Sequence, residues 1–417
     1  MKVLFINLAQ DRDLSFVLRK KEGLRYNRIG PATPLALQIL ASLMPPGVYF
    51  DIVDDNFEFI NYDGGYDLVA MHAHDALAAH RGKVIYERFK QKGIPVVIGG
   101  RFIQTIPQEV ALECADSCVM SEGEYIWKEI VTDVRKNKLQ PVYRSEGLVD
   151  LCQKDLPLPR RDIIDNKNYR YITVEIARGC YYHCSFCTAQ LLFRGTYRTY
   201  PIERIERDLE AVLSNFNQKD NVIYLVDEDI SMERDYKIEL FRRIEKYHMP
   251  WIALSNIAVG EDDELLEAIS KSGCRRLYIG FESLEPDNLR LIDKPLTHKI
   301  DNYKKNINNI HKHNIEVWGL FIFGLDNDYR GVAKRTLRFV KESNLDYFSA
   351  SVLTPIFKTK LYYQLEQEGR LISKEWFKYW YKVVYQPKNI SVLRLKDEFD
   401  YFAKKSRDNV IAAGLIV

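Results

Sequence analysis

The sequence lacks any long apolar run, and its opposite charges nearly balance. No stretch of about 18 consecutive apolar residues occurs in the chain, so we expect no transmembrane segment. A formal net charge of +2 over 417 residues argues against a broad basic surface and therefore against a general nucleic-acid partner. The strand-like N-terminal segment 1–7 also lacks the small-residue cleavage site of a secretory signal. We therefore expect a globular, cytoplasmic protein.

Cysteine is scarce, but its distribution is informative. Of the seven cysteines, Cys180, Cys184 and Cys187 form a C-x3-C-x2-C pattern on one short loop. The odd count and the expected reducing compartment argue against disulfides. Structural zinc takes four ligands, usually from paired C-x2-C groups, and the sequence has no second such pair. Three thiolates suit a 4Fe–4S cube better, because they leave one iron open to a small molecule, whereas electron-transfer clusters take four cysteines.

Two series of alternating strand-like and helix-like segments predict an α/β fold. Residues 1–135 indicate a doubly wound, Rossmann-like parallel sheet, and the proline-punctuated residues 136–170 are predicted to be a linker. Residues 171–370 predict a partial (β/α)6 barrel of the TIM type, and 371–417 a short C-terminal extension that closes it. The expected strands are 3–7, 49–53, 68–71, 96–98 and 117–120, then 172–177, 222–226, 251–255, 276–280, 316–323 and 347–353.

The cysteine loop resembles that of the radical S-adenosylmethionine (SAM) superfamily, whose CxxxCxΦC motif has an aromatic residue where Phe186 stands. The resemblance implies that Cys180, Cys184 and Cys187 bind a 4Fe–4S cluster and that SAM chelates the open iron. Reductive cleavage of SAM would give a 5′-deoxyadenosyl radical, with electrons from a donor such as flavodoxin or ferredoxin. Active sites of such barrels gather at the carboxyl ends of the strands, and the cysteine loop directly follows the first predicted one.

Further segments resemble the cobalamin-associated class of this superfamily. Residues 272–283 resemble its "AGC…GFES" segment, and 317–326 resemble "GxFIxGLP", although Asp326 replaces the usual proline and Asp328 stands for a glutamate. The acidic segment 226–230 resembles one near the SAM amino group, but it could equally be a solvated helix start. The resemblance implies SAM contacts from Phe186, Asp227, Glu228, Ser255, Glu282, Ser283 and Gly324.

The N-terminal part resembles the cobalamin-binding domain that precedes such barrels, at residues 66–70, 94–100 and 121–124. Gly99 and Gly100 end a predicted strand, where missing side chains let a backbone approach a bulky ligand. Residues 101–105 replace the usual "PHPT" stretch, and no D-x-H-x-x-G motif is present. His72 follows the third predicted strand and is a candidate axial ligand or corrin contact; the alternative is a hydrogen-bonded histidine at a helix start.

Three functions remain open. The leading hypothesis is a cobalamin-dependent methyltransferase acting on an unactivated carbon of a small-molecule, lipid or peptide substrate. The second keeps the radical but not the methyl transfer, and performs cyclisation, oxidation or rearrangement with or without cobalamin. The third is an RNA- or partner-binding protein with a structural cluster, but the extra domains of such relatives are not visible in residues 371–417. The sequence identifies no catalytic residue, substrate or oligomeric state.

Overall fold

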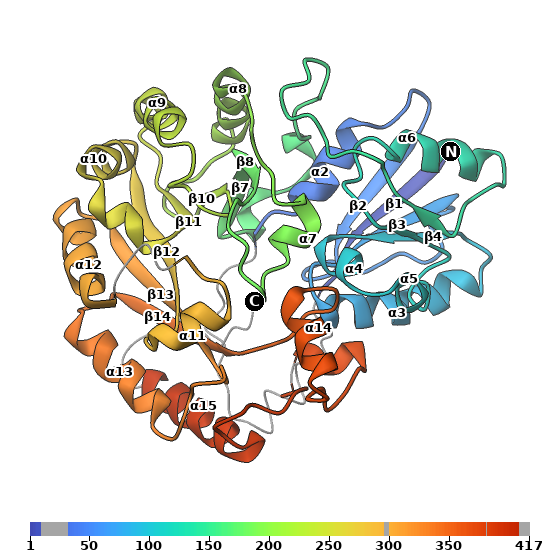
Figure 1. Cartoon of the computed structure of the whole chain (residues 1–417). Coiled ribbons are helices and arrows are strands. Elements are labelled where there is room, and N and C mark those ends of the chain that lie inside the picture. Colours follow the sequence, from blue (N-terminus) through green and yellow to red (C-terminus); the bar gives the residue numbers. More distant parts are fainter. Residues whose placement is uncertain (10–31, 296–299, 381, 408–417) are drawn as a thin grey trace. The chain divides into compact units, whose positions relative to one another are not determined.

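The protein is described here by a computed structural model that covers residues 1–9, 32–295, 300–380 and 382–407. Contacts within the chain divide these residues into two compact units. Unit 1 contains residues 1–9, 33–168 and 375–380, and unit 2 contains residue 32, the described part of 169–374, and 382–407. Each unit is built around a six-stranded parallel sheet (Figure 1). The predicted α/β class is therefore confirmed.

The sheet of unit 1 has the strand order β2-β1-β3-β4-β5-β6. From β1 the chain builds outward in both directions, because β2 pairs with one edge of β1 and β3 with the other. Such a reversal creates a crevice beyond the carboxyl ends of the two strands beside it. The strands are β1 (Lys2–Asn7), β2 (Tyr49–Asp54), β3 (Leu68–His72), β4 (Val96–Gly99), β5 (Ser117–Val119) and β6 (Val142–Tyr143). The helices are α2 (Leu35–Ser42), α3 (Ala76–Lys90), α4 (Arg101–Thr105), α5 (Gln108–Ala111) and α6 (Trp127–Arg135).

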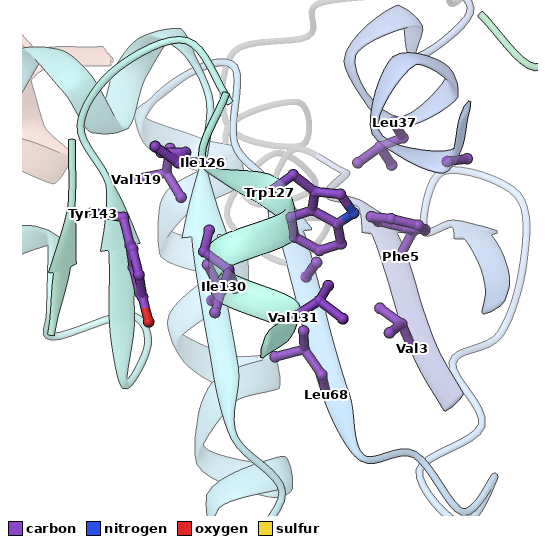
Figure 2. Packing of buried hydrophobic residues seen from close by; sticks show 13 residues of the cluster. Val3, Phe5, Leu37, Leu68, Val119, Ile126, Trp127, Ile130, Val131 and Tyr143 are labelled. Atoms are coloured by element: carbon purple, nitrogen blue, oxygen red, sulfur yellow. The ribbon is translucent and has the colours of Figure 1, made fainter. Parts of the chain in front are cut away.

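One face of this sheet packs against α2 and α6 (Figure 2). Strand residues two apart share a face. Val3 and Phe5 of β1 therefore point into the same cluster, and the Phe5 ring centroid lies 5.3 Å from that of Trp127. The next position of this row on β1 is Asn7, at the carboxyl end, and the corresponding row on β3 ends at His72. An apolar core thus gives way to polar side chains at the edge of the sheet.

Two segments outside the predicted first domain belong to unit 1. Residues 136–168, for which we predicted a linker, include β6, and the Tyr143 hydroxyl donates to Asp133 Oδ2 of α6 at 2.8 Å. The 3-10 helix η6 (Trp376–Trp380) also belongs here, whereas we expected this tail to close the barrel. The Trp376 ring centroid lies 6.0 Å from that of Phe102 and 6.4 Å from that of His80. The elements β6 and η6, with two and five residues, are too short to show a periodic pattern.

Unit 2 has its parallel strands in the sequential order β7-β10-β11-β12-β13-β14, as a partial (β/α)6 barrel requires. Figure 1 shows helices along the outside of these strands. The strands are β7 (Tyr171–Glu175), β10 (Val222–Val226), β11 (Trp251–Ser255), β12 (Cys274–Glu282), β13 (Glu316–Phe323) and β14 (Tyr347–Val352). The helices are α8 (Ile202–Leu213), α9 (Arg234–Ile244), α10 (Asp263–Lys271), α11 (Pro286–Leu291), α12 (Tyr303–Lys312), α13 (Val332–Glu342), α14 (Lys360–Gln367) and α15 (Val392–Arg407).

A small antiparallel hairpin, β8 (Ala177–Gly179) with β9 (Tyr197–Thr199), follows β7 directly. It encloses the cysteine loop and the short helix α7 (Ala189–Phe193). In the described part of the chain, none of the helices combines the length and the apolarity needed to cross a bilayer.

Candidate active site

The cysteine loop leaves the hairpin through a turn that only glycine permits. Gly179 has φ +104°, and a Cβ there would lie 1.9 Å from the carbonyl oxygen of Thr196. The backbone N–H of Cys180 donates to that same carbonyl at 3.1 Å. Gln190 Nε2 then donates to the carbonyl of Cys180 at 3.0 Å and to that of Tyr182. The first half of the loop is therefore held by its own hairpin and by α7.

The second half of the loop is attached to two other parts of the barrel. The N–H of Ser185 donates to the carbonyl of Ile292 at 2.9 Å, and the N–H of Leu361 donates to the carbonyl of Ser185 at 2.9 Å. Phe186 packs against an apolar cluster that includes Ile292, Leu325 and Leu361. Phe186, predicted as a cofactor contact, is thus seen to fix the loop between its second and third cysteines.

The three thiols are half-buried and electrostatically coupled. Burial, with a smaller contribution from the charge of Cys187, raises the pKa of Cys180 to about 12 and that of Cys184 to about 11. Cys187 Sγ accepts a hydrogen bond from Ala189 N at 3.4 Å. Because iron binds the thiolate, cluster assembly would release these protons. Among the described residues no group of three or more His, Cys, Asp or Glu could hold a single metal ion, but each cysteine of a cube binds a different iron. The donor set therefore fits a cube.

Asp227, a predicted SAM contact, is committed to a buried network. Its Oδ2 lies 2.5 Å from Lys237 Nζ and 2.7 Å from the Tyr197 hydroxyl, and its Oδ1 accepts from Asp229 N at 3.2 Å. The side chains of Asp227 and Lys237 are both fully buried. Because Tyr197 lies on β9, this network fastens the cysteine hairpin to β10 and α9. The arrangement favours a supporting role for Asp227.

Asp229, which was not predicted as a site residue, acts electrostatically on the cysteine loop, whereas Asp227 does not appear among the groups that shift the pKa of Cys180. The charge of Asp229 raises the pKa of Cys180. Asn256 Nδ2 donates to Asp229 Oδ2 at 2.6 Å, while Ser255 Oγ lies 3.4 Å from Oδ1. The predicted residue Ser255 therefore contacts this carboxylate, and Glu228 remains half-buried beside it. The sequence indicates only the acidic segment as a whole, because it does not show which neighbours each carboxylate contacts in the folded barrel.

Glu282 ends β12 in a strained conformation. Its φ is +59°, at a point where the register between β12 and β13 shifts. Glu282 Oε1 lies 3.1 Å from Lys294 Nζ, and the Lys294 charge lowers the pKa of Cys184. Burial alone would lower the pKa of Lys294, but Glu282 and the Cys184 thiolate raise it above its usual value. Lys294 was also missed, because no spacing or periodicity marks a single lysine after a helix.

Ser283, the next residue, is turned toward the start of α11. Its Oγ accepts from Asn288 Nδ2 at 3.1 Å and from the N–H of Glu285 at 3.1 Å. Asn288 in turn donates to Asp328 Oδ1 at 2.9 Å. Ser283 thereby connects the end of β12 with the loop after β13.

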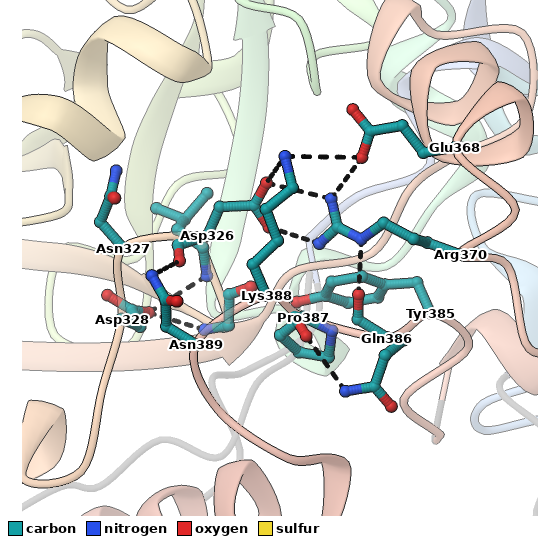
Figure 3. A network of polar contacts seen from close by, with 12 residues as sticks. Asp326, Asn327, Asp328, Glu368, Arg370, Tyr385, Gln386, Pro387, Lys388 and Asn389 are labelled. Atoms are coloured by element: carbon teal, nitrogen blue, oxygen red, sulfur yellow. Dashed lines mark hydrogen bonds and ion pairs between the residues drawn. The ribbon is translucent and has the colours of Figure 1, made fainter.

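That loop is held by a cluster of charges (Figure 3). Gly324 has φ +101°, and its carbonyl accepts from the Tyr385 hydroxyl at 2.5 Å. Asp326 forms ion pairs with Arg370 and, at 3.2 Å, with Lys388. We call Asp326, Arg370, Lys388 and Glu368 the β13 clamp, since Glu368 lies 2.7 Å from Arg370. The aspartate that replaces the usual proline is thus the centre of this clamp.

A second candidate region lies within unit 1, at the carboxyl edge of its sheet. Asn7, Asp54, His72 and Gly99 end four adjacent strands and are paired in register. Asn7 Nδ2 donates to Asp54 Oδ2 at 2.9 Å, and His72 Nδ1 lies 3.3 Å from Asn7 Oδ1. Burial and the charge of His74 lower the pKa of His72 to about 4, so its ring is neutral. Gly100 follows with φ +121°, where a Cβ would lie 2.2 Å from the carbonyl oxygen of Ala73.

A cavity lies at the other end of the barrel strands. It holds about 300 Å³ and is bordered by Arg170, Cys274, Arg276 and Glu316, among others, at or next to the N-terminal ends of the strands. Functional sites of such barrels lie at the carboxyl ends, so we assign this cavity no catalytic role. Cys274, a buried residue at the start of β12, is part of this lining and not of the cysteine loop.

A family comparison agrees with the arrangement of the barrel. Residues 174–352 match the radical SAM superfamily. The chain therefore contains a radical SAM domain. It is accordingly an enzyme, and its radical SAM domain implies a 4Fe–4S cluster and SAM as cofactors.

Proteins with similar sequences include some that are described as methyltransferases. Bacteriochlorophyllide d C-12(1)-methyltransferase of Chlorobaculum tepidum is 29% identical over 374 residues, which cover 88% of this chain and 80% of that protein. Bacteriochlorophyllide d C-8(2)-methyltransferase of the same organism is 26% identical over 363 residues, which cover 84% of this chain and 79% of that protein.

Among solved structures, the radical SAM methyltransferase TsrM from Kitasatospora setae has a TM-score of 0.71 at 14% identity, covering 88% of this chain and 76% of that one. The cobalamin-dependent SAM radical enzyme OxsB has a TM-score of 0.69 at 15% identity, covering 98% and 66%. At these identities the likeness shows that the fold is shared.

Proposed function

We propose that this radical SAM enzyme is a cobalamin-dependent methyltransferase acting on an unactivated carbon of a small-molecule, lipid or peptide substrate. The observation that carries the proposal is the combination of two sites on one chain: a cysteine loop at the carboxyl end of a barrel, and a switch-point edge in a separate parallel sheet. Relatives described as methyltransferases span both parts of the chain. The TsrM and OxsB structures, which share the fold, contain cobalamin.

In this proposal Cys180, Cys184 and Cys187 hold the cluster, which supplies one-electron cleavage of SAM at its open iron. The carboxylates of Asp229 and Glu282 accept hydrogen bonds from the SAM ammonium group, and Lys294 donates to its carboxylate. The backbone at Gly324 faces the adenine. Phe186, Asp227, Glu228, Ser255 and Ser283 support these groups from the contacts described above.

In unit 1, Gly99 and Gly100 border the corrin and His72 contacts it. The Gly99 edge fits a bulky planar ligand because no side chain extends from the last position of β4. A donor such as flavodoxin or ferredoxin supplies electrons, and we place the enzyme in the cytoplasm, where an oxygen-sensitive cluster is protected.

Anaerobic reconstitution with iron, sulfide and cobalamin tests the proposal. With methyl-labelled SAM and a reductant, we expect stoichiometric bound corrin, label in the corrinoid fraction, and slow formation of 5′-deoxyadenosine even without substrate. Cys184→Ala should abolish deoxyadenosine formation and the cluster absorbance. It should leave the corrin content unchanged, because Cys184 lies in unit 2 and the proposed corrin site lies in unit 1. A full cluster with no retained corrin contradicts the proposal.

The second candidate function is radical chemistry without methyl transfer. It is favoured by a relative described as anaerobic magnesium-protoporphyrin IX monomethyl ester cyclase of Rubrivivax gelatinosus, 23% identical over 62% of this chain and 51% of that protein. It is also favoured by the altered residues 101–105, which form α4 and direct Phe102 toward Trp376. Deoxyadenosine formation without label in the corrinoid would support this alternative.

A further inference from the structure

The polar edge of unit 1 fixes the orientation of one amide. The Asp54 carboxylate is held by Asn56, whose backbone N–H and side-chain nitrogen both donate to Oδ1, at 2.9 and 2.7 Å. Its Oδ2 faces Asn7. An ionised carboxylate only accepts hydrogen bonds, so Asn7 must present its NH2 group to Asp54. The carbonyl oxygen of Asn7 must then point the other way, toward His72.

This orientation determines which nitrogen of His72 carries hydrogen. An amide carbonyl is acceptor-only, so the contact between Asn7 Oδ1 and His72 Nδ1 requires a hydrogen on Nδ1. In a neutral imidazole the other nitrogen, Nε2, then carries a lone pair. We call Asp54–Asn7–His72 the amide relay. Metal-binding histidines characteristically donate their second ring N–H to such an acceptor, which fixes the ring and raises its basicity.

The amide relay lies where a large ligand can reach it. His72 ends β3 at the β1/β3 reversal of strand order, and its side chain is partly exposed. Its register partner on β1 is Asn7, and its partner on β4 is Gly99. On the β1 side of His72 the Asn7 amide contacts the imidazole, and on the β4 side the register partner Gly99 has no side chain. Among the described residues, Nε2 of His72 takes part in no hydrogen bond.

We propose that His72 Nε2 is the axial protein ligand to the cobalt of the corrinoid, an inference that rests on the proposed binding of cobalamin by unit 1. The lone pair of Nε2 forms a Co–N bond as a water molecule or the cofactor's own base nitrogen leaves the metal. No electron or proton is transferred in this exchange, because the proton stays on Nδ1. The histidine is supplied from the end of β3, without a D-x-H-x-x-G motif.

His74, two residues away, is the natural comparison. Its Nε2 lies 3.1 Å from Asp75 Oδ2 and is therefore already engaged, and about half of its side chain is exposed. Asp75 in turn caps α3 by accepting from Ala78 N at 2.8 Å. The proposal depends on an Nε2 atom without a hydrogen-bond partner among the described residues at the carboxyl edge of the sheet. His72 has such an atom and His74 does not.

Electron paramagnetic resonance of bound cob(II)alamin tests the assignment on the intact chain. With the iron–sulfur cluster left in its oxidised, silent state, each cobalt line should split into three from one 14N ligand. Protein grown with 15N-labelled histidine should show doublets instead. Triplets that survive the isotope would mean that the cofactor's own base is bound, and unsplit lines would mean that no nitrogen is bound; either result overturns the proposal.

Variants add a second measurement. His72→Ala should remove the nitrogen splitting, whereas His74→Ala should retain it. The isotope experiment on the unmodified protein stands even if His72→Ala fails to fold. Failure of the wild-type protein to retain corrin is distinguishable, since it would refute the proposed cobalamin function itself.

Discussion

At the scale of single residues, buried charges support the cysteine loop from two sides. Arg178 of β8 makes a bidentate ion pair with Glu175, at 2.9 and 2.8 Å, and Tyr200 contacts both. The Asp227–Lys237 pair holds the other strand of the hairpin through Tyr197. Burying charges is costly unless they are well paired, so these residues are sensitive points.

Lys237→Met should destabilise the barrel by about 3 kcal/mol or more, because it leaves the Asp227 carboxylate buried without its cation. Chemical denaturation followed by fluorescence measures this change, and iron content after reconstitution should fall with it. The double variant Lys237→Met/Asp227→Asn removes both charges and should recover most of the stability. Equal losses in the single and double variants would contradict the interpretation.

Asp328 should make stability depend on pH. Burial raises its pKa to about 6 from 3.8, although hydrogen bonds from Gly324 and Leu325 oppose the shift. The folded state therefore binds more protons than the unfolded state between these values, and stability falls as pH rises from about 4 to about 6. Asp328→Asn should flatten that part of the profile in thermal unfolding. An unchanged difference between pH 4 and pH 7 would contradict the assignment.

The sequence marks some of these residues and not others. The spacing of Cys180, Cys184 and Cys187 indicates a shared loop because only local chain geometry is involved. Lys294 and Asp229 depend on how distant segments are turned in the folded barrel, which no local pattern encodes. Asp227 and Asp229 are indistinguishable in sequence, since both are acidic residues after the same strand.

At the scale of elements, the parallel strands were predicted well because buried strands have continuous apolar runs bounded by polar turns. The strands β6, β8 and β9 and the 3-10 helix η6 were not predicted, because they are short or rely on contacts with distant residues. The β13 clamp belongs to this second group. Arg370 and Lys388 meet Asp326 only once the chain has returned past β14.

Asp326→Asn should loosen the loop after β13, because it removes the charge that Arg370 and Lys388 share. We expect a loss of roughly 2 kcal/mol, typical of hydrogen bonds to charged groups. Hydrogen exchange at Gly324 and Leu325 should be faster. The exposed pair Lys360–Asp293 provides a control: Asp293→Asn should change stability by under about 0.5 kcal/mol. Similar effects of the two substitutions would argue against the clamp.

At the scale of the whole molecule, the chain forms two units, and each unit is assembled from stretches that are not contiguous in the sequence. Residues 375–380 return to unit 1, and 382–407 belong to unit 2. Composition and periodicity predicted the two sheets but not this exchange, because η6 has only five residues and is identified by its contacts.

Trp376→Ala should therefore destabilise unit 1 selectively. Trp376 is 7% exposed and packs near Phe102 and His80, so truncation should cost roughly 3 kcal/mol. Hydrogen exchange should become faster in α3 and α4 while the barrel strands remain protected. Phe59→Ala provides the control, since that ring is 95% exposed. Faster exchange confined to unit 2 would contradict the assignment of η6.

The return of η6 to unit 1 has a consequence for biosynthesis. A ribosome delivers the strands of the first sheet early, but Trp376 emerges only after all six barrel strands have been made. The nascent first unit must therefore wait, with the η6 contacts of α3 and α4 unmade, until the barrel strands have been synthesised. The unit whose strands come first in the chain is thus completed only after the strands of the second sheet have been synthesised.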